Sequence, residues 1–364
     1  MAMPVSVEAP VRFFPGADRN WADRILEACP TLRAGCRPPR WARNGHAQAA
    51  LSLLLDDRAP NKVWDLDERL TMADGGTVSL QWDGLNEPQE TPVLVVLHTL
   101  CGSGDGLRRF INSMRQKLGW VVVACNRRGH ADLPLTAHGI NTMGFVRDLE
   151  EQLDRIAERR PSSPLYGVGI SAGSGLLVRY LGEKREASRF EAGIAAGPAY
   201  DIPSGLQHVH WGYDTYLTRK MIRFFLERNR ATLGDHAGFD RCLQARTMLE
   251  FHEHLYPLAG YESREAYEVA SDPMQVAADM TTPVLVLNAE DDPVCSVINV
   301  HRHANAMQKL PRAITALTRY GGHCGFFERA HPDSSWADRA FAEFLKAAEA
   351  QRKSSDAETL PDST

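Results

Sequence analysis

Apolar runs of strand length alternate with segments of helical periodicity along most of the chain. The runs are 93–97, 121–125, 165–169, 192–196, 283–287 and 314–317. After Thr142, apolar residues recur at intervals of three and four, which places them on one face of a helix. Strands that are apolar on both faces belong in a parallel sheet covered by helices on both sides. The pattern therefore predicts an α/β fold with a mostly parallel, twisted sheet flanked by helices.

Segments that interrupt the alternation of apolar strands and helices divide the chain into parts. The first residues are irregular and rich in Pro and Arg, and a hairpin is predicted on either side of the turn 74–76. The expected parts are an extension wrapping the core (1–60), the first part of the core (61–197), a helical cap insertion (198–280), the second part of the core (281–350) and a disordered polar tail (351–364).

Composition and charge narrow the class of protein. The 364 residues include 41 Lys+Arg and 46 Asp+Glu, a formal net charge of −5, and 43% are hydrophobic. These values are typical of a globular protein, and the net charge is not basic enough to indicate a nucleic-acid partner, so none is expected. No apolar run reaches the ~20 residues of a membrane span, and no signal-peptide pattern opens the chain. Seven scattered cysteines favour reduced thiols and a cytoplasmic location.

A serine lies between a predicted strand and a predicted helix. Residues 169–173 read Gly-Ile-Ser-Ala-Gly, a Gly-x-Ser-x-Gly pattern centred on Ser171. In this context the small flanking residues allow a turn so tight that the serine projects from the sheet edge, with a helix N-terminus behind it. The alternative is a glycine-rich turn with an incidental serine. The pattern makes Ser171 the candidate nucleophile.

A carboxylate and a histidine follow two later strands. Asp291 and Asp292 come after the run 283–287, and His323 lies in a glycine-rich loop after 314–317. A nucleophilic serine needs a base, and the base needs an orienting group. We predict His323 as the base and Asp292 as the acid, because acid loops of this kind usually continue with one residue and then an apolar residue. Asp291 then hydrogen-bonds loop amides or is solvated.

Donors for the developing oxyanion are expected beside this serine. The strand 93–97 ends at His98, and we expect the backbone N–H groups of Leu100 and Ala172 to form the oxyanion hole. His98 is interpreted as a brace for this loop, while Cys101 and Cys324 are expected to pack as small apolar residues.

Metal binding is not expected from the histidines. Three His-x-His pairs occur, at 208/210, 252/254 and 301/303. All lie in segments predicted as helix or loop, and two residues apart on a helix the side chains point ~200° apart. We therefore predict no metal and no cofactor.

With these residues in place, the chain resembles the YheT-like branch of the α/β-hydrolase superfamily, which includes the embryogenesis-associated hydrolases of plants. The resemblance covers about residues 37–345. It is carried by Pro38–Gln48, Asp74–Gly76 with Trp82, Asn126–Gly129 with Pro134–Thr136, residues 169–173, Glu250–Phe251 to Gly260–Tyr261, Ala266–Tyr267 to Ala270–Ser271, Asn288–Pro293 and Gly321–His323.

The resemblance implies an α/β-hydrolase fold with a helical cap, a Ser-Asp-His triad, and carboxylic esters with medium or long acyl chains as substrates. Two positions depart from the family. Thr99 replaces the family's glycine after the histidine, and Ser174 replaces a second glycine after the serine turn. Thr99 either adds a hydroxyl donor or narrows the pocket.

The sequence thus predicts a serine esterase or lipase acting on a small-molecule acyl ester. One alternative is an acyltransferase that uses the same acyl-enzyme, and another is a catalytically idle binding protein. Residues 216–230 of the cap combine apolar and basic side chains. They are interpreted as a cap helix packed on the core, with weak peripheral membrane contact as the alternative. The oligomeric state stays open.

Overall fold

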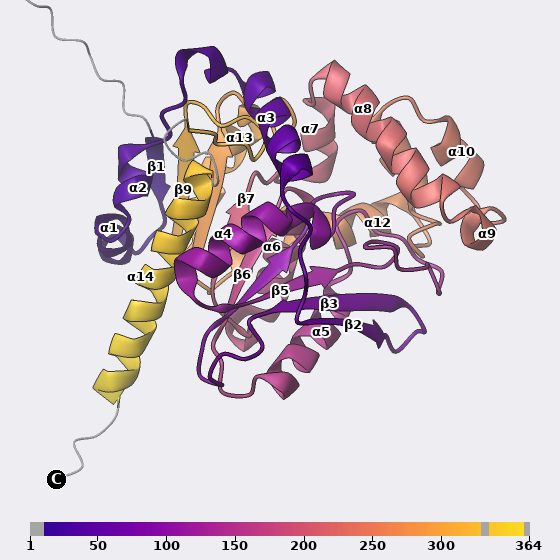
Figure 1. Ribbon diagram of the computed structural model, residues 1–364. Helices are drawn as coiled ribbons and strands as arrows, with labels where there is room; N and C mark the ends of the chain where they lie inside the picture. The colour runs from indigo at the N-terminus through magenta and orange to yellow at the C-terminus, as the bar shows by residue number, and fades with distance from the viewer. Residues whose placement is uncertain (1–10, 329–334, 360–364) are drawn as a thin grey trace, which may run out of the picture.

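The computed structural model describes residues 11–328 and 335–359, and it is built around one nine-stranded sheet (Figure 1). The strand order is β1-β9-β8-β7-β6-β4-β5-β3-β2. The strands are β1 (Val11–Pro15), β2 (Leu66–Thr71), β3 (Thr77–Asp83), β4 (Val93–Leu97), β5 (Val121–Asn126), β6 (Leu165–Ile170), β7 (Phe190–Ala196), β8 (Val284–Ala289) and β9 (Ala313–Thr318). The strands β9, β8, β7, β6, β4 and β5, neighbours in that order, pair in parallel, whereas β1, β2 and β3 pair antiparallel with their neighbours. The predicted mostly parallel sheet and the hairpin are confirmed.

Helices cover both faces of this sheet. One face packs against α1 (Arg19–Glu27), α2 (Pro30–Ala34), α4 (Arg108–Leu118) and α14 (Trp336–Thr359). The other packs against α5 (Val146–Arg159), α6 (Ala172–Lys184) and α13 (Val297–Met307). Along β4, Leu94 and Val96 face the first group, while Val93 and Val95 face the second. This alternation explains why the central strands are apolar throughout.

The insertion between β7 and β8 consists mainly of short helices joined by turns. It holds α7 (Ile202–Gln207), α8 (Trp211–Met221), the π-helix η4 (Ile222–Glu227), α9 (Arg230–Leu233), α10 (Phe239–Gln244), α11 (Met248–Leu255) and α12 (Arg264–Ser271). These helices share an apolar cluster of their own, distinct from the two clusters that cover the sheet. In Figure 1 the segment from α8 to α10 projects from one end of the sheet.

The expected irregular extension is wrong in one respect, because residues 11–60 contain regular elements. Besides α1 and α2, this segment forms β1, which pairs antiparallel with β9 and becomes the edge of the sheet, and α3 (Gly45–Arg58). An edge strand needs only one partner, so its five residues lack the continuous apolar pattern of a central strand. Residues 1–10 lie outside the described residues.

The expected disordered tail is also wrong over residues 351–359. The last helix, α14, continues to Thr359. Glu349 forms ion pairs with Arg352 and Lys353 one turn further on, an arrangement that stabilises helices. A polar composition therefore did not mean disorder here, because the polar residues occur at helical spacing. Residues 360–364 lie outside the described residues.

Candidate active site

Ser171 lies on the sharp turn between β6 and α6. Its backbone has φ 54° and ψ −117°, a conformation that costs a non-glycine residue energy and that is common at functional sites. The two flanking glycines make the turn possible. A Cβ at Gly169 would lie 2.3 Å from the Gly173 carbonyl oxygen, and one at Gly173 would lie 2.2 Å from the Leu97 carbonyl oxygen. The Gly-x-Ser-x-Gly pattern is therefore required by the close approach of α6 to β4 and β6.

Asp292 lies on the loop after β8, where the backbone holds its carboxylate. Oδ1 accepts hydrogen bonds from the N–H groups of Val294 and Cys295, both at 2.8 Å. Oδ2 lies 3.0 Å from His323 Nδ1. The side chain is 1% exposed, so water does not compete for it. The carboxylate is thereby fixed in one orientation toward His323.

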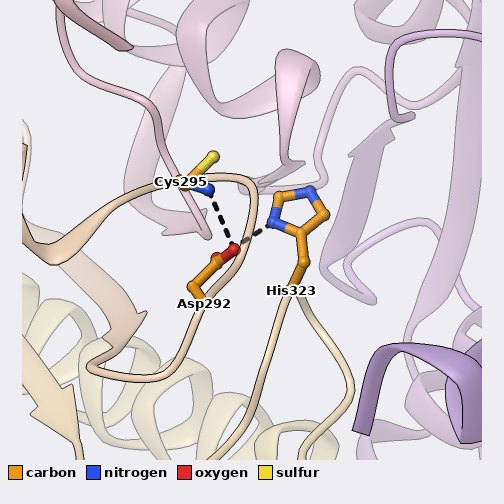
Figure 2. Close-up of side chains that lie close together, drawn as sticks. All are labelled: Asp292, Cys295 and His323. Carbon is orange, nitrogen blue, oxygen red and sulfur yellow. Dashed lines mark hydrogen bonds and ion pairs between the residues drawn. The ribbon is translucent and has the colours of Figure 1, made fainter. Parts of the chain in front are cut away.

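His323 joins Asp292 to Ser171. Its Nδ1 meets the Asp292 carboxylate, as Figure 2 shows, and its Nε2 lies 2.9 Å from Ser171 Oγ. A carboxylate can only accept, so Nδ1 carries the hydrogen and Nε2 presents its lone pair to the serine hydroxyl. Burial lowers the pKa of His323, but the charge and hydrogen bond of Asp292 outweigh it and the net pKa is raised. The three side chains form one hydrogen-bonded chain.

Asp291 points to a different partner. Its Oδ1 accepts the N–H of Gly322 at 2.9 Å, so it bonds a loop amide, as the sequence led us to expect. Burial raises the pKa of its carboxyl group. The structure thus places Asp292 against the imidazole and Asp291 against the backbone of the loop that carries His323.

Asp292, Cys295 and His323 also form a group with metal-ligand chemistry, with potential ligand atoms within 4.8 Å of one another (Figure 2). A cysteine ligates as the thiolate. Burial, together with the nearby Asp292 charge, raises the pKa of Cys295 well above its usual value and keeps it a thiol. The hydrogen bonds of Asp292 account for this grouping without an ion.

The histidine pairs have separate contacts. His208 Nδ1 lies 2.8 Å from the Ser204 carbonyl oxygen, and His210 accepts the Gly212 N–H at the start of α8. His252 is buried beside Thr142, whereas His303 contacts Asp201. None of these contacts brings the two members of a pair to a shared ligand position.

The expected oxyanion donors lie beside Ser171. Leu100 is in the loop after β4, Ala172 is the first residue of α6, and both line the cavity that contains Ser171. Within the described residues, neither N–H has a hydrogen-bond acceptor. His98 is 1% exposed and contacts the Thr99 carbonyl oxygen through Nδ1 at 2.9 Å, as expected of a brace.

The cavity at Ser171 has a volume of about 400 Å³ and a mostly apolar wall. The cap contributes Leu206, Val209, Tyr216, Leu217 and Met248, and the core contributes Ala49, Leu53, Phe110, Ala337 and Phe341. The sequence pointed to the cap but missed the residues from α3, α4 and α14. Those helices carry no local signal for a pocket, because only the packing of distant segments forms the wall.

The apolar side chains of residues 216–230 face the interior of the cap. Met221, Phe225 and Leu226 belong to its apolar cluster, and Leu217, Ile222 and Phe224 pack against it. This favours the interpretation as a packed cap helix. No helix in the described part of the chain is long and apolar enough to cross a membrane.

The sheet order, the serine turn and the helical insertion define this chain as an α/β-hydrolase. Residues 88–329 match the family described as serine aminopeptidase, S33. The match covers more than half of the chain, and the protein belongs to that family. The predicted superfamily is confirmed.

Named relatives cover most of the chain. Phospholipase ABHD3 of Homo sapiens is 27% identical in an alignment of length 341 that covers 89% of this chain and 81% of that protein. Embryogenesis-associated protein EMB8 of Picea glauca is 27% identical, covering 78% and 66%. Medium-chain fatty acid ethyl ester synthase/esterase 2 of Saccharomyces cerevisiae is also 27% identical, covering 78% and 70%. The embryogenesis-associated relationship inferred from the sequence is thereby supported.

Solved structures agree on the fold. An esterase of Pyrococcus furiosus superposes with a TM-score of 0.53 at 16% identity, covering 86% of this chain and 97% of that one. Est1E of Butyrivibrio proteoclasticus gives a TM-score of 0.51 at 15% identity, covering 78% and 99%. At these identities the likeness concerns the fold alone.

Proposed function

We propose that this protein is a serine hydrolase of carboxylic esters, with Ser171 as nucleophile, His323 as base and Asp292 as the orienting acid. The observation that carries the proposal is the hydrogen-bonded chain from Asp292 through His323 to Ser171 Oγ at an apolar cavity. Relatives named phospholipase, monoacylglycerol lipase and esterase support ester hydrolysis.

The geometry supports a two-step reaction. His323 Nε2 takes the Ser171 proton as Oγ attacks the ester carbonyl, and then gives it to the leaving alcohol. Water, deprotonated by the same nitrogen, releases the acyl group as an acid and restores the serine. The N–H groups of Leu100 and Ala172 would stabilise the oxyanion in both steps. This chemistry requires no cofactor.

The cavity wall favours an acyl ester over the amino-terminal peptides that the family description suggests. An aminopeptidase needs an unengaged anion to bind the substrate's α-ammonium group. Of the carboxylates in the cavity wall, Asp56 forms an ion pair with Arg109 at 2.6 Å, and Asp338 accepts hydrogen bonds from Ser335. The remaining wall is mostly apolar and suits the medium-length acyl chain of an ester or acylglycerol.

An acyltransferase is the second candidate. The same acyl-enzyme transfers its acyl group to an alcohol when alcohol replaces water, and the yeast relative is named both synthase and esterase. Product analysis with ethanol added to the assay separates the two activities, since only transfer yields the ethyl ester. A catalytically idle binding protein is less well supported, because the imidazole is already within hydrogen-bond distance of Ser171 Oγ.

Labelling with a fluorophosphonate tests the nucleophile. We expect the native protein to be labelled and Ser171→Ala to be unlabelled, with ester turnover at least about 10³-fold lower. Ser174→Ala is the matched control, because that hydroxyl binds the Ser171 carbonyl rather than the imidazole. Equal labelling of Ser171→Ala and native protein contradicts the assignment. A series of p-nitrophenyl esters of increasing acyl length then measures the depth of the pocket.

Two lesser expectations belong to this proposal. All seven cysteines are free thiols, which supports a cytoplasmic location. Trp211 and Tyr216 on α8 are exposed at 77% and 53%, and the last turn of the same helix carries Arg219 and Lys220, which supports weak contact of the cap with lipid. Absence of liposome co-sedimentation at low salt would remove the lipid contact.

A further inference from the structure

Two adjacent arginines after β5 have opposite environments. Arg128 forms ion pairs with Asp74 at 2.7 Å and Asp148 at 2.6 Å. Arg127 is equally buried, at 7% exposure, yet no carboxylate among the residues the structure describes forms an ion pair with it. Burial without an anionic partner is costly, and it lowers the Arg127 pKa to about 10. The guanidinium still carries its charge at neutral pH.

The Arg127 guanidinium donates to backbone carbonyls, most of them in the loop after β4, residues 98–102. Its Nη2 donates to the carbonyl oxygens of Thr99 at 2.7 Å and Leu100 at 3.2 Å. Its Nη1 donates to those of His98 at 3.3 Å and Met143 at 3.4 Å. Three successive residues of the loop after β4 are therefore held by one side chain. This contact is possible because β4 and β5 are parallel neighbours, with Leu97 paired to Cys125.

These bonds determine where the N–H groups of the loop point. In a trans peptide, the carbonyl of one residue and the N–H of the next point in opposite directions. With the carbonyls of Thr99 and Leu100 directed at Arg127, the N–H groups of Leu100 and Cys101 are directed away from it. Both residues line the Ser171 cavity, and neither N–H has an acceptor within the described parts of the chain.

Arg127 shares the Thr99 carbonyl oxygen with two other hydrogen-bonding groups of the loop. The Thr99 carbonyl oxygen accepts from Arg127 and lies within hydrogen-bond distance of His98 Nδ1 and of the Gly102 N–H, at 2.9 and 3.2 Å respectively. These contacts hold the backbone of the loop in one conformation at Thr99.

We propose that Arg127 is a positioning residue for the reaction, because it holds the loop after β4 so that the N–H of Leu100, one of the two proposed oxyanion donors, and the neighbouring N–H of Cys101 face the Ser171 cavity. The inference rests on the proposed ester-hydrolase function. Arg127 is not in the cavity wall, so it acts through the peptide groups rather than by touching the substrate. Its charge lies behind those peptides and strengthens them as donors, since a nearby cation polarises a carbonyl that accepts from it.

The test compares Arg127→Met with Arg160→Met in the full-length protein. Arg160 is a matched control, because it is also buried, at 1% exposure, and also donates to backbone carbonyls, those of Glu87 and Pro88. It precedes β6, at the amino-terminal end of that strand, whereas the site lies at the carboxyl-terminal end. We expect Arg127→Met to lower kcat about 100-fold with KM changed less than about threefold. Arg160→Met should lower the melting temperature and leave kcat within about twofold.

Hydrogen exchange supplies a readout that does not depend on activity. Peptides covering residues 98–104 should exchange faster in Arg127→Met than in the native protein, and at the native rate in Arg160→Met. If Arg127→Met does not fold, Arg127→Lys replaces it, with intermediate exchange and kcat about tenfold lower, because lysine keeps the charge but lacks the planar fork.

The proposal is overturned if residues 98–104 of the Arg127 variant exchange hydrogen at the native rate. It is also overturned if the native protein hydrolyses esters and the Arg127 variant has the same kcat. If the native protein turns over no ester and takes no fluorophosphonate, the proposed function fails. The exchange of residues 98–104 still decides whether Arg127 holds the loop.

Discussion

The active site has two sides that are built in different ways. One is the edge formed by the carboxyl ends of the parallel strands, called the sheet edge below, and the other is the cap. Ser171, Asp292 and His323 each lie on a turn or loop after a parallel strand, and backbone contacts hold the turns. The cap helices instead contribute apolar side chains to the cavity and pack on a cluster separate from those of the sheet. Changes at the sheet edge should therefore alter the rate for every ester, whereas changes in the cap should alter which ester is preferred.

The largest expected effect lies at the sheet edge and separates two adjacent carboxylates. Asp292→Asn should lower kcat about 10⁴-fold for every ester, because an amide opposite Nδ1 favours the wrong imidazole tautomer. Asp291→Asn should lower it less than about tenfold, since its oxygen accepts a loop amide rather than meeting the imidazole. Steady-state kinetics on short and long esters measure both variants. A reversed order would move the acid to Asp291.

The pH dependence should be the same for all esters, because it arises at the sheet edge. His323 acts as a base only when neutral, and Asp292 raises its pKa above the ordinary value. The value of kcat/KM should therefore fall about tenfold per pH unit below a midpoint above ~6.5. In Asp292→Asn the midpoint should move to lower pH, because burial then acts alone, while Asp291→Asn leaves it in place. A midpoint unmoved by Asp292→Asn would contradict this account.

The smallest expected effect lies in the cap and depends on the substrate. Leu206→Trp fills part of the cavity, so turnover of p-nitrophenyl octanoate should fall about tenfold while the acetate stays within about twofold. Leu243→Trp is the control, because Leu243 packs on the cap cluster outside the cavity wall. Equal losses on both esters in Leu206→Trp would show that cap and sheet edge are not separable.

Much of the fold could be predicted because it is encoded locally. Each central strand is a continuous apolar run, and each proposed reacting residue lies on the turn or loop that follows such a run. Because the carboxyl ends of parallel strands meet at one edge, the chain order of Ser171, Asp292 and His323 was enough to expect them together. The tight turn at Ser171 was also visible in sequence, since only glycine fits beside it.

Other features depend on contacts between distant segments. The strand β1 exists because Val11 to Pro15 pair with β9 some three hundred residues later, and the cavity wall combines α3, α4 and α14 with the cap. Arg127 carries no special signal beside Arg128, yet one is bound by backbone carbonyls and the other by carboxylates.

The sequence by itself determined the α/β class, the chemistry-bearing residues and their common edge, because strand pattern and turn chemistry are properties of short segments. Only the tertiary structure decided which carboxylate faces the imidazole, what lines the cavity and what holds the loop after β4. Those outcomes are decided by burial and by hydrogen bonds between segments far apart in the chain, and neither is written in any short stretch of residues.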